Sequence, residues 1–189
     1  INFIGNAIGE VFFQRISENN QNISDFLEKI YKYMVLLAIP VFSFLGILGE
    51  DIFHVFFGSI WSEAGVYSQI LCLLIFTKFI TIPSHYLMLL NEKQEYSILL
   101  NVAAFAVSVV SLVIGGILGN VYISFILYSA SNSVVYAVYG FGFMINNGLS
   151  FKKIFKIFME SFIKCFPLLL ILVVIKLFLN INELQIVII

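Results

Sequence analysis

The chain has 189 residues, of which 61% are hydrophobic and only 11% are charged, and its mean hydropathy is +1.03. Soluble domains have about 45–50% apolar and about 25% charged residues, so this composition excludes an ordinary soluble domain. The formal net charge of −1 excludes the strong positive field with which many proteins attract nucleic acid. We therefore expect an all-α, polytopic helix bundle in a lipid bilayer, with no nucleic-acid partner.

Five apolar segments approach or reach the length that a membrane-spanning helix requires. Such a helix needs roughly 20 apolar residues, and its backbone must satisfy its own hydrogen bonds because the lipid offers none. In chain order the segments are residues 33–57, 66–90, 97–118, 121–145 and 162–181. Shorter apolar runs at residues 1–14 and 184–189 are interpreted as parts of two further spans, so we expect the chain to be a piece of a longer protein.

Two polar connecting segments are predicted to contain amphipathic helices. Residues 15–32 are the most polar stretch, and Ser24, followed by Asp25 and Glu28, is typical of the capped start of a short amphipathic helix that leads into the next span. In residues 146–161, phenylalanine and isoleucine recur at helical spacing opposite three lysines. This pattern is typical of a helix that lies on a membrane surface.

Among the connecting segments and the span ends beside them, basic residues occur only in alternate ones. The segments around residues 50–64, 119–120 and 180–184 hold no Lys or Arg. The other set holds Arg15, Lys29, Lys32, Lys93, Lys152, Lys153, Lys156 and Lys164. Because short basic loops stay on the cytoplasmic side, we expect all of the basic segments to face the cytoplasm. The predicted location is the inner membrane of a bacterium, as a multi-pass protein.

One lysine, Lys78, lies near the middle of the predicted span 66–90. A charge at this depth is unfavourable by about 2.5–3.5 kcal/mol on insertion scales, so the side chain needs a partner or a wet cavity. Thr81 and His85 follow at i+3 and i+7 and share the same helix face. This stripe is interpreted either as an anion-attracting wall of a transport pathway or as part of a structural pair with a carboxylate such as Glu10.

Glu10 itself allows two interpretations. It lies near the end of the first apolar run, close to Arg15, so it is either an interfacial residue paired with that arginine or an interior proton or ion site.

A polar and aromatic stripe runs along the predicted span 121–145. Its members fall at offsets that keep them on one helix face: Ser124, Tyr128, Ser131, Asn132, Tyr136 and Tyr139. Aromatic rings stack on sugar rings while hydroxyls and amides exchange hydrogen bonds with them, so one interpretation is a sugar-facing wall. The other is hydrogen bonding between helices, which such side chains commonly provide inside bundles.

The other residue patterns are explained by helix packing. A face of small residues in the span 97–118 is predicted to pack against a neighbouring helix; it consists of Asn101, Ala104, Ser108, Ser111 and Gly115. Cys72 and Cys165 lack the spacing of a metal site or of a disulfide framework. We therefore predict no metal, no cofactor and no catalytic residue.

Several short, degenerate sequence motifs follow one another along the chain in a characteristic order. A helix tail at Val11–Ser17 (VFFQRIS) precedes a basic loop and a helix that contains Pro40. An outer loop follows at Phe57–Gly65 (FGSIWSEAG), and the next long helix closes at Leu89–Lys93 (LLNEK). This order resembles the C-terminal half of the polysaccharide flippases, in the multidrug/oligosaccharidyl-lipid/polysaccharide exporter superfamily. The resemblance covers essentially the whole chain.

The resemblance implies a transporter, not an enzyme, that flips undecaprenyl-diphosphate-linked oligosaccharide across the bacterial inner membrane during O-antigen, lipopolysaccharide or capsule assembly. The implied partners are the lipid bilayer, this lipid-linked substrate and other polysaccharide-assembly proteins. Lys78 would then face the diphosphate, and the stripe from Ser124 to Tyr139 would face the sugar. Two alternative functions stay open: a membrane-embedded polysaccharide polymerase, and a small-molecule or drug antiporter of the same superfamily.

Overall fold

A computed structural model describes residues 23–187 of the chain, with side chains described for residues 24–178. Over this range the structure is helical and contains no strand, which confirms the predicted all-α fold. Its elements are α2 (Ile23–Phe57), a short 3₁₀ helix η1 (Ser59–Trp61), α3 (Ser62–Leu90), α4 (Gln94–Ile117), α5 (Val121–Asn146) and α6 (Phe151–Val187). Five of these helices are long and apolar enough to cross a membrane, so the chain is a multi-pass membrane protein.

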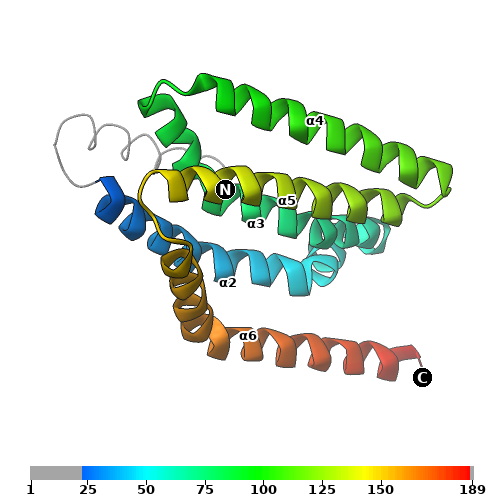
Figure 1. Ribbon diagram of the computed structural model, residues 1–189. Coiled ribbons are helices and arrows are strands. Elements are labelled where there is room, and N and C mark those ends of the chain that lie inside the picture. Colours follow the sequence, from blue (N-terminus) through cyan, green and yellow to red (C-terminus); the bar gives the residue numbers. More distant parts are fainter. Residues whose placement is uncertain (1–22, 188–189) are drawn as a thin grey trace.

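The helices pack in the order α4, α5, α3, α2, α6 rather than in chain order. Figure 1 shows that successive helices from α2 to α5 run in opposite directions, so the start of α2, the end of α3, the start of α4 and the end of α5 lie at one end of the bundle. Lys93, in the turn between α3 and α4, and Lys152 and Lys153, at the start of α6, are therefore at the same end as Lys29 and Lys32. We call this the basic end; that it faces the cytoplasm stays a prediction.

The four spans predicted between residues 33 and 145 agree closely with α2 to α5, but the predicted surface helix at residues 146–161 differs in one respect. It is joined to the following span without a break, because α6 begins at Phe151. The amphipathic helix that we predict to lead into the span 33–57 is part of α2, which begins at Ile23. Ser24 lies inside α2, and its hydroxyl donates a hydrogen bond to the backbone oxygen of Gly148 at 3.0 Å. The predicted partial span 1–14, which contains Glu10, lies outside the described residues.

The C-terminal boundary also differs from the prediction. We expected a connecting segment at residues 180–184 and a new apolar run from residue 184, whereas α6 continues through these positions to Val187. The segment Asn180–Glu183 is polar but contains neither proline nor glycine, so nothing in the local sequence ends a helix there. Residues 188 and 189 lie outside the described range.

The hydrophobic core lies toward the basic end, where α2, α3, α5 and the start of α6 meet. Its largest fully buried side chains include Tyr31, Met34, Leu87 and Met144. The ring of Tyr31 meets that of Phe141 edge-on, with centroids 6.0 Å apart, an arrangement that aromatic pairs prefer. This packed region holds together the half of the bundle that lies toward the basic end.

Glycine permits two close helix crossings. A Cβ atom at Gly65 of α3 would lie 2.5 Å from the Cα atom of Glu50 in α2. A Cβ atom at Gly140 of α5 would lie 2.6 Å from the Cγ2 atom of Thr81 in α3. Small residues allow helix backbones to approach closely in a membrane, where van der Waals contact and hydrogen bonds replace the hydrophobic effect between helices.

Helix α6 changes direction along its length. Figure 1 shows that its first part runs across the axes of the other helices, and that the remainder then runs roughly along them. Pro167 lies inside α6, and a proline both lacks the donor for the carbonyl of residue 163 and clashes with it. The proline accounts for the bend between the two parts of the helix.

Candidate functional site

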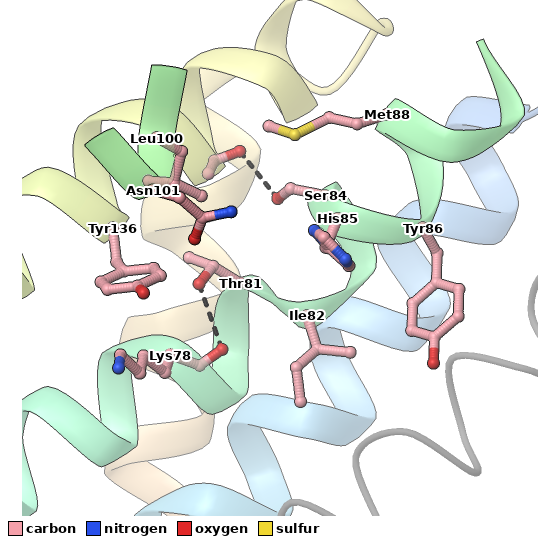
Figure 2. Close-up of a pocket in the computed structure, with 11 residues that line it drawn as sticks. Lys78, Thr81, Ile82, Ser84, His85, Tyr86, Met88, Leu100, Asn101 and Tyr136 are labelled. Atoms are coloured by element: carbon pink, nitrogen blue, oxygen red, sulfur yellow. Dashed lines mark hydrogen bonds between the residues drawn. The ribbon is translucent and has the colours of Figure 1, made fainter. Parts of the chain in front are cut away.

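A pocket of about 230 Å³ lies between α3, α4 and α5 in the half of the bundle toward the basic end. Helix α3 supplies most of its wall, α4 supplies two residues and α5 supplies two (Figure 2). The lining residues are Lys78, Thr81, Ile82, Ser84, His85, Tyr86, Met88, Leu100, Asn101, Tyr136 and Gly140. The lining therefore combines one formal positive charge with hydroxyl, imidazole, amide and apolar groups.

Lys78 is the charged residue of this pocket. Its side chain is half-buried, and its Nζ atom lies 4.6 Å from the centroid of the Tyr136 ring. A cation over an aromatic face is attracted by the ring quadrupole, by roughly 0.5–2 kcal/mol depending on solvation. Within residues 24–178 no carboxylate lies within 4.0 Å of this ammonium group. The alternative partner Glu10 lies outside the described residues, so that pairing stays a prediction.

Local features of α3 shape the wall on which Lys78 lies. Pro83 has no N–H and leaves the carbonyl of Phe79 without its helical donor. The hydroxyl of Thr81 donates to the backbone oxygen of Thr77 at 2.8 Å and to that of Lys78 at 3.1 Å. Such back-bonding satisfies hydroxyls in an apolar medium and often bends a helix. The part of α3 that contains Pro83 and Thr81 therefore forms the pocket wall.

The crossing of α3 and α5 determines where Tyr136 lies. The Ser84 hydroxyl donates to the backbone oxygen of Gly140 at 2.8 Å, and Gly140 packs against Thr81. Tyr136 precedes Gly140 by one helical turn on the same face. The close crossing at Gly140 therefore brings the Tyr136 ring beside Lys78, as Figure 2 shows.

The stripe predicted on α3 is brought together in this pocket, since Lys78, Thr81 and His85 all line it. His85 is exposed, and its ring is edge-on to that of Tyr86 with centroids 6.2 Å apart. Asn101, which we assigned to a packing face, is an exposed residue of the pocket wall instead. The remainder of that face does pack on α5, with Ala104, Ser111 and Gly115 buried.

The stripe predicted on α5 divides between two neighbours. Tyr136 lines the pocket, whereas the polar atoms of Ser131 and Asn132 contact α4. Ser131 exchanges a hydrogen bond with Ser111 over 2.9 Å, and the Asn132 amide donates to Ser108 over 3.0 Å.

The three remaining members of the stripe lie away from the pocket lining. Ser124 packs against Gly115 near the end of the bundle opposite the basic end, and Tyr128 and Tyr139 are half-buried. A contact between sugar and these residues stays a prediction.

Two polar contacts at that opposite end were not predicted. Lys176 of α6 donates to Asp51 of α2 over 2.6 Å, with both side chains mostly buried. Glu63 accepts hydrogen bonds from Tyr67 at 2.7 Å and from Tyr122 at 3.3 Å, which ties α3 to α5. A charge inside or beside an apolar run needs a partner. This rule identifies Asp51 and Lys176 from the sequence as residues that need partners, but it does not show that they are partners of each other.

The described residues hold no group of three or more His, Cys, Asp or Glu placed to bind a metal ion. The chemistry that the pocket offers is therefore that of one ammonium group, an aromatic face and neutral hydrogen-bonding groups. Comparison of the chain with protein-family models, with curated proteins and with solved structures gave no match.

Proposed function

We propose that this chain is part of a membrane transporter that moves a lipid-linked, anionic saccharide across the bacterial inner membrane. The substrate that fits the proposal is undecaprenyl-diphosphate-linked oligosaccharide, for the assembly of a surface polysaccharide such as O-antigen or capsule. One observation carries the proposal: Lys78 lines a pocket between three membrane-spanning helices and has no carboxylate within 4.0 Å among residues 24–178.

The charge of Lys78 supports an anionic substrate. An ammonium group in a medium of low dielectric interacts strongly with a phosphate, because the interaction is screened much less than in water. A lysine that served only structure would gain most from a carboxylate beside it. The neighbour of Lys78 is the Tyr136 ring, a weaker partner that a diphosphate oxygen can displace.

The other pocket groups support a saccharide next to the phosphate. Tyr136 offers an aromatic face, and Asn101 and His85 offer amide and imidazole groups that exchange hydrogen bonds with hydroxyls. Ile82, Met88 and Leu100 line the same pocket with apolar atoms, which suits the lipid that carries the sugar.

The test is export in a strain that lacks the full-length gene and is complemented with variants. We expect Lys78→Ala to reduce surface glycan at least tenfold, because the cation that holds the phosphate is lost, and Lys78→Arg to retain most of it. Lys93→Ala is the matched control, since among residues 24–178 the ammonium group of Lys93 lies within 4.0 Å of one carboxylate, that of Glu95, in an exposed pair at 3.8 Å. Membrane insertion is measured for each variant by quantitative immunoblotting of membrane fractions.

Full export by Lys78→Ala at normal protein levels would remove this pocket from the mechanism. The length of the residual glycan separates transport from synthesis. A surface that carries single repeat units, with only chain length reduced, would favour a membrane-embedded polymerase over the transporter.

A further inference from the structure

The first part of α6, residues 151–166, has three distinct faces. One face packs on the bundle, with Ile154 4%, Ile157 5% and Ser161 2% exposed. A second face is aromatic and exposed; it consists of Phe151 (63%), Phe155 (57%), Phe162 (38%) and Phe166 (48%). The third face is basic and exposed, with Lys152, Lys153, Lys156 and Lys164.

The direction of this segment fits a position at the membrane surface. Figure 1 shows that residues 151–166 run across the axes of the other helices and lie at the basic end. A helix crossing the bundle axis at its end lies along the bilayer surface, where an apolar face enters the acyl region and a basic face stays among the head groups. The exposed phenylalanines lie between the buried face and the lysines on the helix circumference.

The lysines of this segment are incompletely neutralised. Lys153 forms an ion pair with Glu28 of α2 at 2.7 Å, and Lys156 lies 3.8 Å from Glu160. Lys152 and Lys164 have no carboxylate within 4.0 Å in the part of the chain whose side chains are described. The exposed basic face therefore carries a net positive charge next to the aromatic face.

We propose that residues 151–166 bind anionic phospholipids of the leaflet at the basic end. The phenylalanine face inserts among the acyl chains, and Lys152, Lys156 and Lys164 contact the phosphates of head groups such as phosphatidylglycerol. Charge complementarity selects this partner, because each lysine near an anionic surface raises affinity by roughly fivefold. The proposal does not depend on the transported substrate.

The test uses a single tryptophan placed on the aromatic face. Trp61 is the only tryptophan of the chain and lies in η1, at the opposite end of the bundle from α6's first residues. The reporter variant is Trp61→Phe/Phe155→Trp, reconstituted in phosphatidylcholine vesicles that contain brominated phosphatidylglycerol or brominated phosphatidylcholine. Bromine quenches tryptophan fluorescence only at close range.

We expect strong quenching by both brominated lipids, and half-maximal quenching by phosphatidylglycerol at a mole fraction several-fold lower than by phosphatidylcholine. The added substitutions Lys152→Gln/Lys156→Gln/Lys164→Gln should bring the two curves together. Lys93→Gln, at the same end of the bundle but on the turn between α3 and α4, should leave them apart.

Two outcomes would overturn the proposal. Blue-shifted emission without quenching would show that protein, rather than lipid, covers the aromatic face. Identical curves for the two lipids in the variant that retains its lysines would show that the basic face does not select anionic head groups. Neither outcome bears on export, which is measured separately with Lys78→Ala.

Discussion

Helices α3 and α6 are both long and apolar, and both contain a proline, yet α3 is central in the bundle and α6 is peripheral. Helix α3 lies in its middle and contacts α2 and α5, whereas α6 lies at its edge and packs mainly on α2. The most apolar stretch of α6 is more hydrophobic than that of α3, but a smaller share of it is buried. In this protein, hydrophobicity does not determine which helix becomes central.

The difference lies in small and hydroxyl-bearing residues. The buried residues of α3 include Gly65, Cys72, Thr81 and Ser84, which allow close approach and form hydrogen bonds to neighbouring carbonyl groups. Beyond Pro167, the exposed residues of the described part of α6 are bulky aliphatic and aromatic side chains such as Ile171 and Val174, which lipid solvates as well as protein does. Close packing and hydrogen bonding, rather than apolar area, therefore distinguish the centre of the bundle from its edge.

The largest loss of stability is expected when a methyl group is added at the crossing of α2 and α3. We expect Gly65→Ala to lower the free energy of unfolding by about 3 kcal/mol, at the upper end of the range for overpacked sites. The new Cβ atom would lie 2.5 Å from the Cα atom of Glu50 and 2.7 Å from the backbone oxygen of Gly49. Backbone atoms cannot rotate away, so the helices must separate. Unfolding in mixed detergent micelles, followed by circular dichroism, measures the change.

Gly116→Ala is the matched control on α4. A Cβ atom at Gly116 would meet nothing within 4 Å, and alanine favours a helix over glycine by roughly 0.8–1 kcal/mol. Stability should therefore stay the same or rise slightly. Equal losses for the two variants would mean that the crossing at Gly65 does not limit how closely α2 and α3 pack.

A smaller effect is expected where α6 is held to α2 by charge. The Lys176–Asp51 pair is 2.6 Å long, with side chains 24% and 18% exposed. We expect Asp51→Asn to lower the free energy of unfolding by about 1–2 kcal/mol, between the values for exposed and buried pairs. The double variant Asp51→Asn/Lys176→Gln should lose less than the sum of the single losses, because no unpaired ammonium group is left.

The same double-mutant cycle on Lys93 and Glu95 provides a reference. These side chains are 54% and 64% exposed and 3.8 Å apart, so their coupling should be at most about 0.5 kcal/mol. Strict additivity for Asp51 and Lys176 would contradict the ionic attachment of α6 to α2.

Sequence patterns predicted the features of this fold that depend on neighbouring residues. Apolar length located α2 to α5, because the bilayer thickness imposes a minimum on each span. Amphipathic periodicity predicted a helix that leads from Ser24 into the next span and a surface helix within residues 146–161, but it did not predict that the second helix is continuous with its span. No glycine or proline separates them from those spans, so a helix continues where the pattern of burial changes.

The candidate site could be predicted only in part, for a geometric reason. Helical spacing placed Ser131 and Tyr136 on one stripe, but a separation of five residues turns the helix by about 140°. That angle is wide enough to contact two neighbours, and Ser131 faces α4 while Tyr136 faces Lys78. The pairing of Asp51 with Lys176 depends on contacts between residues 125 positions apart, which no local pattern contains.

The smallest change in stability is expected when single groups are removed from the two helices: the hydroxyl oxygen of Ser84 in α3, and the two methyl groups of Val174 in α6. Ser84 is 1% exposed and donates to the backbone oxygen of Gly140 at 2.8 Å, whereas Val174 is 62% exposed. We expect Ser84→Ala to lower the free energy of unfolding by about 0.6–1 kcal/mol, as hydrogen bonds between membrane helices do. Val174→Ala should change it by less than about 0.5 kcal/mol, because its methyl groups contact lipid in either state.

The order of these two losses, measured in the same micelles, shows whether polar contacts or apolar area contribute more to the packing of these helices. In the core of a water-soluble protein, Val→Ala would lower the free energy of unfolding more than Ser→Ala. There the burial of two methyl groups contributes more than a single neutral hydrogen bond. A larger loss for Val174→Ala would mean that α6 is covered by protein and that apolar area stabilises the edge of the bundle. A larger loss for Ser84→Ala means that α3 is central because of the groups with which it contacts α5, among them the hydrogen bond to Gly140 one turn from Tyr136.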